Sequence, residues 1–241
     1  RVLHTPITNV EELKFDIIAQ MEGLDRNDKV VVMIDSVGNL ASKKELEDAI
    51  NEKSVADMSR AKALKGLFRM TTPYLNMKNI PLIAVNHTYM EIGLFPKAIV
   101  SGGTGIYYSA DNIWILGRQQ DKQGTEVKGY HFVINVEKSR YVKEKSKIPI
   151  SVSWDGGVQS YSGLLDVALT GNYVAKPSNG WYCRVDRTTG ELIDPRVREK
   201  DTLEEKFWLP IFESTDFKDY IKSKFAIGGK SDNELVLEDT A

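Results

Sequence analysis

V-V-V-M-I-D-S at residues 30–36 is the stretch of sequence that decides the fold. Its first five residues are all apolar, and such an unbroken run predicts a strand buried on both faces of a parallel sheet. The run then delivers a single carboxylate, Asp35. Because ligands of doubly wound folds bind outside the carboxyl ends of the strands, we expect Asp35 to lie at a ligand site.

The carboxylate of Asp35 has two interpretations. In phosphate-binding ATPases an acid at such a strand end holds Mg²⁺, usually through water, because Mg²⁺ dehydrates reluctantly. An aspartate after a core strand can equally cap a helix or start a turn, and apolar runs that end in Asp are common. The run by itself leaves both interpretations open.

A second buried strand is predicted at residues 80–85, and it ends in Asn86 and His87. Between the two strands an apolar stripe recurs at helical spacing, made by Val55, Met58, Ala61, Leu64 and Phe68. A strand, a helix and a strand in this order predict a right-handed parallel crossover. Asp35 and the pair Asn86-His87 should then lie at the same edge of one sheet.

The remaining elements are predicted more coarsely. Asn9 is the expected N-cap of a first helix that stops at Gly23. Residues 88–105 are rich in glycine and are expected to form a long functional or mobile loop. Later strands are predicted at 113–116, 130–136 and 148–154, followed beyond Tyr161 by short helices and a hairpin at about 181–190. A last helix is expected at 217–225.

These elements predict an α/β protein in which a mostly parallel sheet is flanked by helices. We expect a core at residues 1–160, a small α+β C-terminal subdomain at 161–227 and a flexible acidic tail at 228–241. The chain begins with Arg1 and enters a helical pattern directly, so we expect it to be a piece of a longer protein.

Composition narrows the class of protein. The chain has 241 residues, of which 41% are hydrophobic and 27% charged, so it can bury a sizeable core. Its net charge of −2 argues against non-specific coating of polyanions but allows local basic patches. One cysteine excludes an internal disulfide, and the three scattered histidines give no zinc-ligand spacing. The absence of a long apolar run predicts a soluble cytoplasmic protein without membrane contact.

Four segments stand in a characteristic order: V-V-V-M-I-D-S, A-V-N-H at 84–87, S-G-G-T-G at 101–105 and K-S-R at 138–140. Their order and spacing resemble the RecA-type strand-exchange recombinases, most closely those of T-even phages. The resemblance extends along nearly the whole chain and includes Y-S-G-L-L-D at 161–166 and N-G-W-Y at 179–182. It implies a partial RecA-type ATPase core, ATP and Mg²⁺ as cofactors, and homologous recombination and repair as the function. The implied partners are single-stranded DNA, duplex DNA during strand exchange and further copies of the protein in a filament.

The resemblance assigns roles at the nucleotide. Asp35, followed by Ser36, matches the Walker B acid. His87 falls where the family places a polar sensor of the γ-phosphate, although a histidine that closes a strand often only caps backbone groups. Lys138 and Arg140 match paired cations that reach the ATP of the neighbouring subunit, where they would stabilise charge in the transition state.

Other roles concern the adenine and DNA. Trp154 matches an aromatic near the adenine, and a core aromatic at the edge of a sheet is an equally good interpretation. Residues 43–53 match the first DNA-binding loop and 88–105 the second, whose glycines would let backbone N–H groups approach phosphates. The candidate DNA contacts are Lys43, Lys44, Arg60, Lys97, Gly102, Gly103, Thr104 and Gly105. A flexible surface loop is the alternative for 88–105, and a solvated face is favoured for Lys62, Lys65 and Arg69.

One motif departs from the family pattern: G-x-x-x-x-G-K-[ST] occurs nowhere in the chain. In the family this phosphate loop and the catalytic glutamate lie upstream of the matching segment, so we expect that the chain alone neither binds ATP tightly nor hydrolyses it. Two other functions remain open, a ring-forming RecA-fold helicase and a non-catalytic DNA-binding or assembly module. The sequence upstream of Arg1 would discriminate, because a strand followed by a phosphate loop excludes the module.

Overall fold

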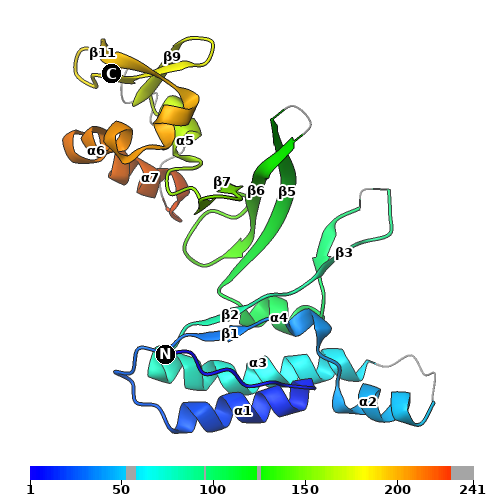
Figure 1. Cartoon of the computed structure of the whole chain (residues 1–241). Coiled ribbons are helices and arrows are strands. Elements are labelled where there is room, and N and C mark those ends of the chain that lie inside the picture. The colour runs from blue at the N-terminus through cyan, green and yellow to red at the C-terminus, as the bar shows by residue number, and fades with distance from the viewer. Residues whose placement is uncertain (53–57, 95, 124–125, 229–241) are drawn as a thin grey trace. The chain divides into compact units, whose positions relative to one another are not determined.

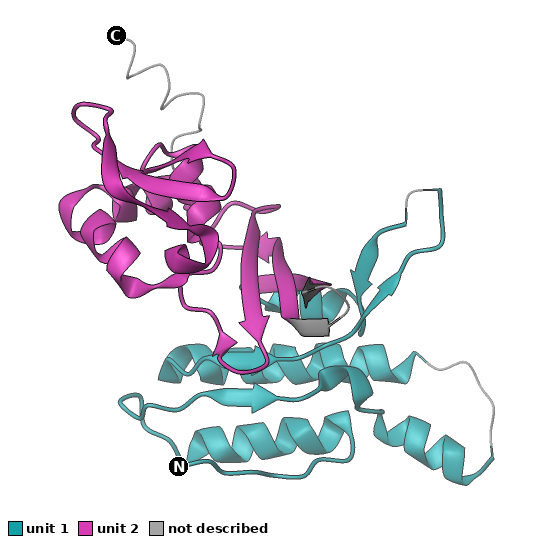
Figure 2. Ribbon diagram, turned by 45° about the horizontal axis from the view of Figure 1, so that its top comes forward, with its two compact units in different colours: residues 1–111 teal, residues 112–241 magenta. Residues whose placement is uncertain are grey.

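The computed structural model describes residues 1–52, 58–94, 96–123 and 126–228. The chain separates into two compact units, residues 1–111 and 112–241 (Figure 2). Four predictions fall wholly or partly outside the described residues: the helix start near Ser54, the end of the 43–53 segment, one residue of the 88–105 segment and most of the acidic tail. Among the helices of the described ranges, we find none with the length and apolarity needed to cross a membrane.

The first helix of unit 1, α1 (Val10–Glu22), begins and ends where the sequence predicts. The side chain of Asn9 accepts a hydrogen bond from the backbone N–H of Glu12 at 2.9 Å, and Gly23 is the C-cap. Its buried residues recur every three or four positions and are Val10, Leu13, Ile17 and Met21. This apolar stripe places α1 on the hydrophobic core of the unit.

The predicted parallel crossover is confirmed. Strand β1 (Val32–Ile34) pairs in parallel with β2 (Leu82–Ala84), and the long helix of the crossover is α3 (Ser59–Lys78). That helix continues beyond the predicted stripe, passes Pro73 and ends at Asn79, whose φ of 56° is left-handed. In Figure 1, α1 and α3 lie side by side along the β1–β2 pair.

The expected burial of the first strand on both faces is wrong. Ile34 is 8% exposed and belongs to the core with α1 and α3, whereas Met33 is 73% exposed. Ile83, on the paired strand, is 53% exposed. Successive side chains of a strand point to opposite faces, so the two helices can cover only one of them.

Residues 88–105 were expected to be a loop, and the described part of this segment contains two short strands and the start of a helix. β3 (Thr88–Met90) and β4 (Ala98–Val100) form an antiparallel hairpin, and α4 (Thr104–Ser109) follows. The strands are too short for an alternating pattern to stand out among the glycines. The segment that matches the first DNA-binding loop is likewise helical, because residues 43–50 form α2 (Lys43–Ile50).

Unit 2 begins with an antiparallel sheet whose strands follow one another in chain order, β5-β6-β7-β8. The strands are β5 (Asn112–Gln123), β6 (Glu126–Ser139), β7 (Lys147–Ser153) and β8 (Gly157–Val158). They contain the strands predicted at 113–116 and 130–136, and the one predicted at 148–154 except for Trp154. β5 and β6 are longer than predicted because their outer halves are polar and carry no apolar signal.

The end of unit 2 has a second hydrophobic cluster, built from residues of the predicted C-terminal subdomain. It contains the buried side chains of Tyr173, Trp208 and Phe217. The predicted hairpin is part of a three-stranded antiparallel sheet, and one helix, α6, was not predicted because Pro210 interrupts its pattern. The elements are α5 (Leu164–Thr170), β9 (Val174–Ser178), β10 (Trp181–Val185), β11 (Leu192–Arg198), η2 (Glu199–Leu203), α6 (Glu205–Ser214) and α7 (Phe217–Phe225).

Candidate functional site

The ends of β1 and β2 meet, as the crossover predicts. After Asp35 the chain turns into η1 (Val37–Asn39), and the N–H of Val37 donates to the carbonyl of Val85 at 2.9 Å. The ring of His87 lies beside this turn, since a Cβ added at Gly38 would stand 2.8 Å from its Cγ and Nδ1. The two polar strand ends that the sequence singled out therefore share one edge of the sheet.

Asp35 and Ser36 are suited to bind Mg²⁺ and a nucleotide. The carboxylate belongs to an exposed residue, and the Oγ of Ser36 is a buried side-chain oxygen with no hydrogen-bond partner within the described ranges. A buried hydroxyl of this kind costs free energy unless something binds it. Among the described residues no group of three or more His, Cys, Asp or Glu could hold a metal. A Mg²⁺ here would therefore take most of its ligands from water and phosphate, as it commonly does.

The end of β4 is tied to the same edge through Ser101. Its N–H donates to the carbonyl of His87 at 2.9 Å, and its carbonyl accepts from the Nδ2 of Asn86 at 2.8 Å. The start of the S-G-G-T-G segment is thereby fixed to the end of β2. This connection was not predicted, because nothing in the spacing of residues 86 and 101 indicates a contact.

The glycines after Ser101 are required by the backbone conformation and by close packing. Gly102 and Gly103 have φ of 96° and 80°, values that residues with a side chain rarely adopt. A Cβ at Gly102 would stand 2.8 Å from the Cδ1 of Leu64, and one at Gly105 would stand 2.7 Å from the Cβ of Lys65. These glycines let α4 approach α3 closely, whether or not they also contact phosphate. Their predicted DNA contacts, and that of exposed Thr104, stay predictions.

Arg60, in the first turn of α3, is half-buried and its guanidinium is engaged by the protein. Its Nε donates to the carbonyl of Leu40 at 2.7 Å, and its Nη2 donates to the carbonyls of Val37 and Gly38 at 3.0 and 2.9 Å. Its Nη1 lies 3.5 Å from the Oγ of Ser101. The predicted DNA contact of Arg60 is untested. In the structure the guanidinium is bonded to groups of the protein itself.

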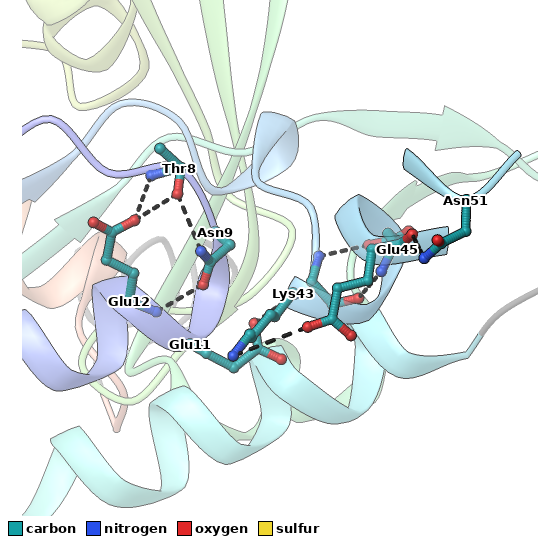
Figure 3. Close-up of polar contacts among 9 residues, drawn as sticks. Thr8, Asn9, Glu11, Glu12, Lys43, Glu45 and Asn51 are labelled. Atoms are coloured by element: carbon teal, nitrogen blue, oxygen red, sulfur yellow. Dashed lines mark hydrogen bonds and ion pairs between the residues drawn. The ribbon is translucent and has the colours of Figure 1, made fainter. Parts of the chain in front are cut away.

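Helix α2 presents Lys43 and Lys44 on an exposed surface. Figure 3 shows its first turn anchored on α1, where the N–H of Lys43 donates to Glu11 Oε2 at 2.9 Å. Ser42 and Glu45 form a capping box, which the S-K-K-E sequence would have predicted. The ammonium groups pair with acids one turn further along at 3.9 Å, a contact worth little at such exposure. Both lysines can therefore reach a polyanion.

Lys97, the remaining candidate DNA contact, is an exposed residue just before β4. Its carbonyl accepts a hydrogen bond from the N–H of Glu91 at 2.8 Å, which closes the described part of the hairpin. The side chain thus belongs to the same hairpin that ends in Ser101.

Lys138 and Arg140 lie at the end of β6 in unit 2, on either side of buried Ser139. The Oγ of Ser139 donates to Asn112 Oδ1 at 2.7 Å and accepts from the N–H of Tyr141 at 3.1 Å. Sequence analysis missed this serine, since a lone Ser between two cations gives no signal. Its bonds fix the backbone that carries both cations.

Trp154 follows β7 and is 61% exposed, which disfavours its interpretation as a core residue. Its ring packs edge-on against Tyr130, with centroids 5.2 Å apart, and Arg118 lies over the same tyrosine at 4.9 Å. An exposed, supported indole suits stacking on a flat ring. Contact with an adenine stays a prediction.

Comparison with known proteins finds relatives among the RecA proteins. The chain is 26% identical to the RecA protein of Bdellovibrio bacteriovorus over 155 residues, which is 63% of the chain and 40% of that protein. It is 22% identical to RecA of Francisella tularensis over 214 residues, or 84% of the chain and 57% of that protein. The chain is thus similar to RecA proteins, as the sequence motifs predicted.

The chain also matches a phage protein, at higher identity. The chain is 53% identical to the recombination and repair protein of Enterobacteria phage T4, UvsX, over 240 residues, which cover 98% of the chain and 61% of that protein. Residues 161–221 match the family described as the C-terminal domain of the bacteriophage T4 recombination and repair protein. The chain therefore spans about three fifths of the length of this relative.

Proposed function

We propose that this chain is part of an ATP-dependent recombinase that assembles into filaments on single-stranded DNA and exchanges strands with a duplex. The observation that carries the proposal is that Asp35, Ser36 and His87 meet at one sheet edge, in a chain 53% identical to a recombination and repair protein. Such a protein would act in the cytoplasm of a bacterial host.

The nucleotide site would be built at this edge. Asp35 would hold Mg²⁺ through water, the Oγ of Ser36 would gain the partner it lacks within the described ranges, and His87 would donate a hydrogen bond to the terminal phosphate. Bound Mg²⁺ with ATP supplies charge neutralisation between the phosphates. Trp154, in unit 2, would contact an adenine, as the resemblance implies, and 61% of its side chain is exposed.

Hydrolysis would require assembly, because Lys138 and Arg140 would act on the ATP of a neighbouring subunit. Two fixed cations near a phosphate stabilise the charge that develops in the transition state. The bonds of Ser139 support this role by fixing the backbone between them. The chain by itself would hydrolyse no ATP, since the phosphate loop of the family lies outside the matching segment.

Single-stranded DNA would lie along two segments of unit 1. The first is α2 with Lys43 and Lys44, and the second is the β3–β4 hairpin with Lys97 and the glycines 102–105. Both segments would contact the phosphate backbone rather than base edges, as binding without sequence preference requires. Affinity should then fall as salt rises, because phosphate neutralisation releases counterions.

ATP turnover with and without single-stranded DNA tests the proposal. The full-length protein should hydrolyse ATP only when DNA is present, and the 241-residue chain alone should show no turnover above background. Duplex unwinding by hexameric rings of the full-length protein would instead indicate a helicase. Turnover by the 241-residue chain alone would contradict the assignment of a partial site.

A further inference from the structure

Arg60 holds together two segments that are distant in sequence. Three of its bonds reach the turn that directly follows Asp35 and Ser36, through the carbonyls of Val37, Gly38 and Leu40. Its fourth contact, to the Oγ of Ser101, reaches the start of the glycine-rich segment. The side chain therefore spans the two regions to which the proposed function assigns nucleotide and DNA.

The geometry of these bonds requires an arginine. A guanidinium offers five N–H donors in a rigid planar fork, whereas a lysine ammonium is a compact charge on a flexible stem. The Nε hydrogen and both Nη2 hydrogens of Arg60 point to backbone carbonyls, which leaves only Nη1 toward Ser101. A phosphate could compete for little more than Nη1.

Ser101 extends the connection to the second strand end. Its N–H donates to the carbonyl of His87, and its carbonyl accepts from Asn86. Movement of Ser101 when DNA binds would therefore act on His87 through the backbone, and on the turn after Asp35 through Arg60. Chains of hydrogen bonds between fixed segments are one physical means by which two sites are coupled.

On the basis of the proposed function, we propose that Arg60 is a positioning residue that couples DNA binding at residues 97–105 to the nucleotide site at Asp35 and His87. It holds the turn after Asp35 in register with the DNA-binding hairpin, and it is not a contact for the DNA backbone. DNA stimulation of ATP hydrolysis then depends on the fork of Arg60, whereas DNA affinity does not.

The test separates affinity from stimulation in the full-length protein. The variants are Arg60→Lys, which keeps the charge and loses the fork, Arg60→Ala, and Arg69→Ala as a control from an exposed position of the same helix. Affinity for a fluorescent oligothymidylate is measured by anisotropy, and ATP turnover is measured over a range of DNA concentrations. Circular dichroism and thermal unfolding establish whether each variant folds.

For Arg60→Lys we expect DNA affinity within about threefold of the unsubstituted protein, because the charge is kept, and turnover at saturating DNA lowered by about tenfold or more. Arg69→Ala should change neither quantity by more than about twofold. The opposite result would be full ATP turnover at saturating DNA in Arg60→Lys together with loss of DNA affinity in Arg60→Ala. That result would establish Arg60 as a DNA contact and overturn the coupling role.

If Arg60→Ala misfolds, Ser101→Ala tests the same coupling. It deletes only the hydroxyl that Arg60 Nη1 contacts. That variant should also lower saturated turnover more than affinity, and unchanged turnover would count against coupling through Ser101. If the unsubstituted protein binds no DNA, the proposed function itself is wrong, and the role of Arg60 is withdrawn with it.

Discussion

The imidazole of His87 occupies the space that a side chain at residue 38 would fill. A Cβ added to Gly38 would stand 2.8 Å from both Cγ and Nδ1 of the ring, closer than real Cβ contacts occur, and 3.2 Å from the Oδ1 of Asn86. The glycine of the turn after Asp35 thus gives the proposed γ-phosphate sensor its position. His87 can be placed against the Asp35 turn only because residue 38 has no side chain.

Gly38→Ala should therefore displace the His87 ring and lower DNA-stimulated ATP turnover of the full-length protein by about tenfold, with little loss of stability, because a side chain can rotate away. Steady-state turnover and thermal unfolding measure the two effects. Gly66→Ala is the matched control, since a Cβ there meets nothing within 4 Å. Full turnover in Gly38→Ala would argue that the position of His87 does not matter for hydrolysis.

Much of unit 1 could be predicted because its signals are local. Asn9 with a following apolar stripe predicted α1, and the apolar run before Asp35 predicted β1 and its place in a parallel crossover. The exposure of Met33 could not be predicted, because a strand's pattern does not say what covers each face. The bonds of Arg60 join residues 20 to 41 positions apart, a separation at which spacing carries no information.

Lys138→Ala should abolish DNA-dependent ATP hydrolysis in the full-length protein and leave the fold of the monomer intact, because the cation would serve the neighbouring subunit. Turnover, DNA affinity and circular dichroism are the measurements. Lys145→Ala removes a nearby lysine from the turn after the K-S-R segment and should retain turnover within about twofold. Mixed filaments of Lys138→Ala and unsubstituted protein should lose activity in proportion to the variant, and retained turnover in Lys138→Ala alone would exclude the interface role.

Tyr173 donates a hydrogen bond from its hydroxyl to Asp216 Oδ1 at 2.8 Å in the core of the C-terminal cluster. Tyr173→Phe should lower the free energy of unfolding by about 0.5–1.5 kcal/mol, because the exposed carboxylate can recover water as a partner. Urea unfolding measures the change. Tyr141→Phe, at a site 64% exposed, is the control and should have no measurable effect.

The same tyrosine predicts a pH dependence. Burial, and then the hydrogen bond and charge of Asp216, raise the pKa of Tyr173 above the ordinary value of 10.0. The folded state thus favours the protonated phenol, so its contribution to stability is complete below pH 10.0 and is lost as the pH rises toward the raised pKa. Between about pH 9 and about pH 11 the free energy of unfolding should fall more for the native chain than for Tyr173→Phe. An equal fall in the two proteins would contradict the assigned pKa shift.

Cys183, the single cysteine of the chain, lies buried in β10, and burial raises the pKa of its thiol. Because the thiolate is the reactive form, a thiol reagent should modify native Cys183 at least about a hundredfold more slowly than the unfolded chain. Reaction with a chromogenic disulfide, followed with and without urea, measures both rates. A native rate equal to the unfolded rate would mean that the three-stranded sheet does not protect Cys183.

Residues 161–227 should fold without the rest of the chain, since their cluster has its own aromatic core. Trp208 is fully buried and stacks on Phe217 at a centroid distance of 5.9 Å. The truncated piece would lose the bonds from Lys143 to the carbonyl of Phe225 and from Ile227 to the carbonyl of Tyr141, so its melting temperature should be lower than that of the longer chain.

Cooperative loss of near-ultraviolet circular dichroism and of tryptophan fluorescence on heating would establish this subdomain as an independent folding unit. Trp208→Ala within the same piece should abolish the transition, because removal of a buried Trp costs about 3–5 kcal/mol, as much as a small domain can spare. A gradual, non-cooperative melt of the unsubstituted piece would show that the strands from residue 112 onward are needed. The folding unit would then be the whole of residues 112–241.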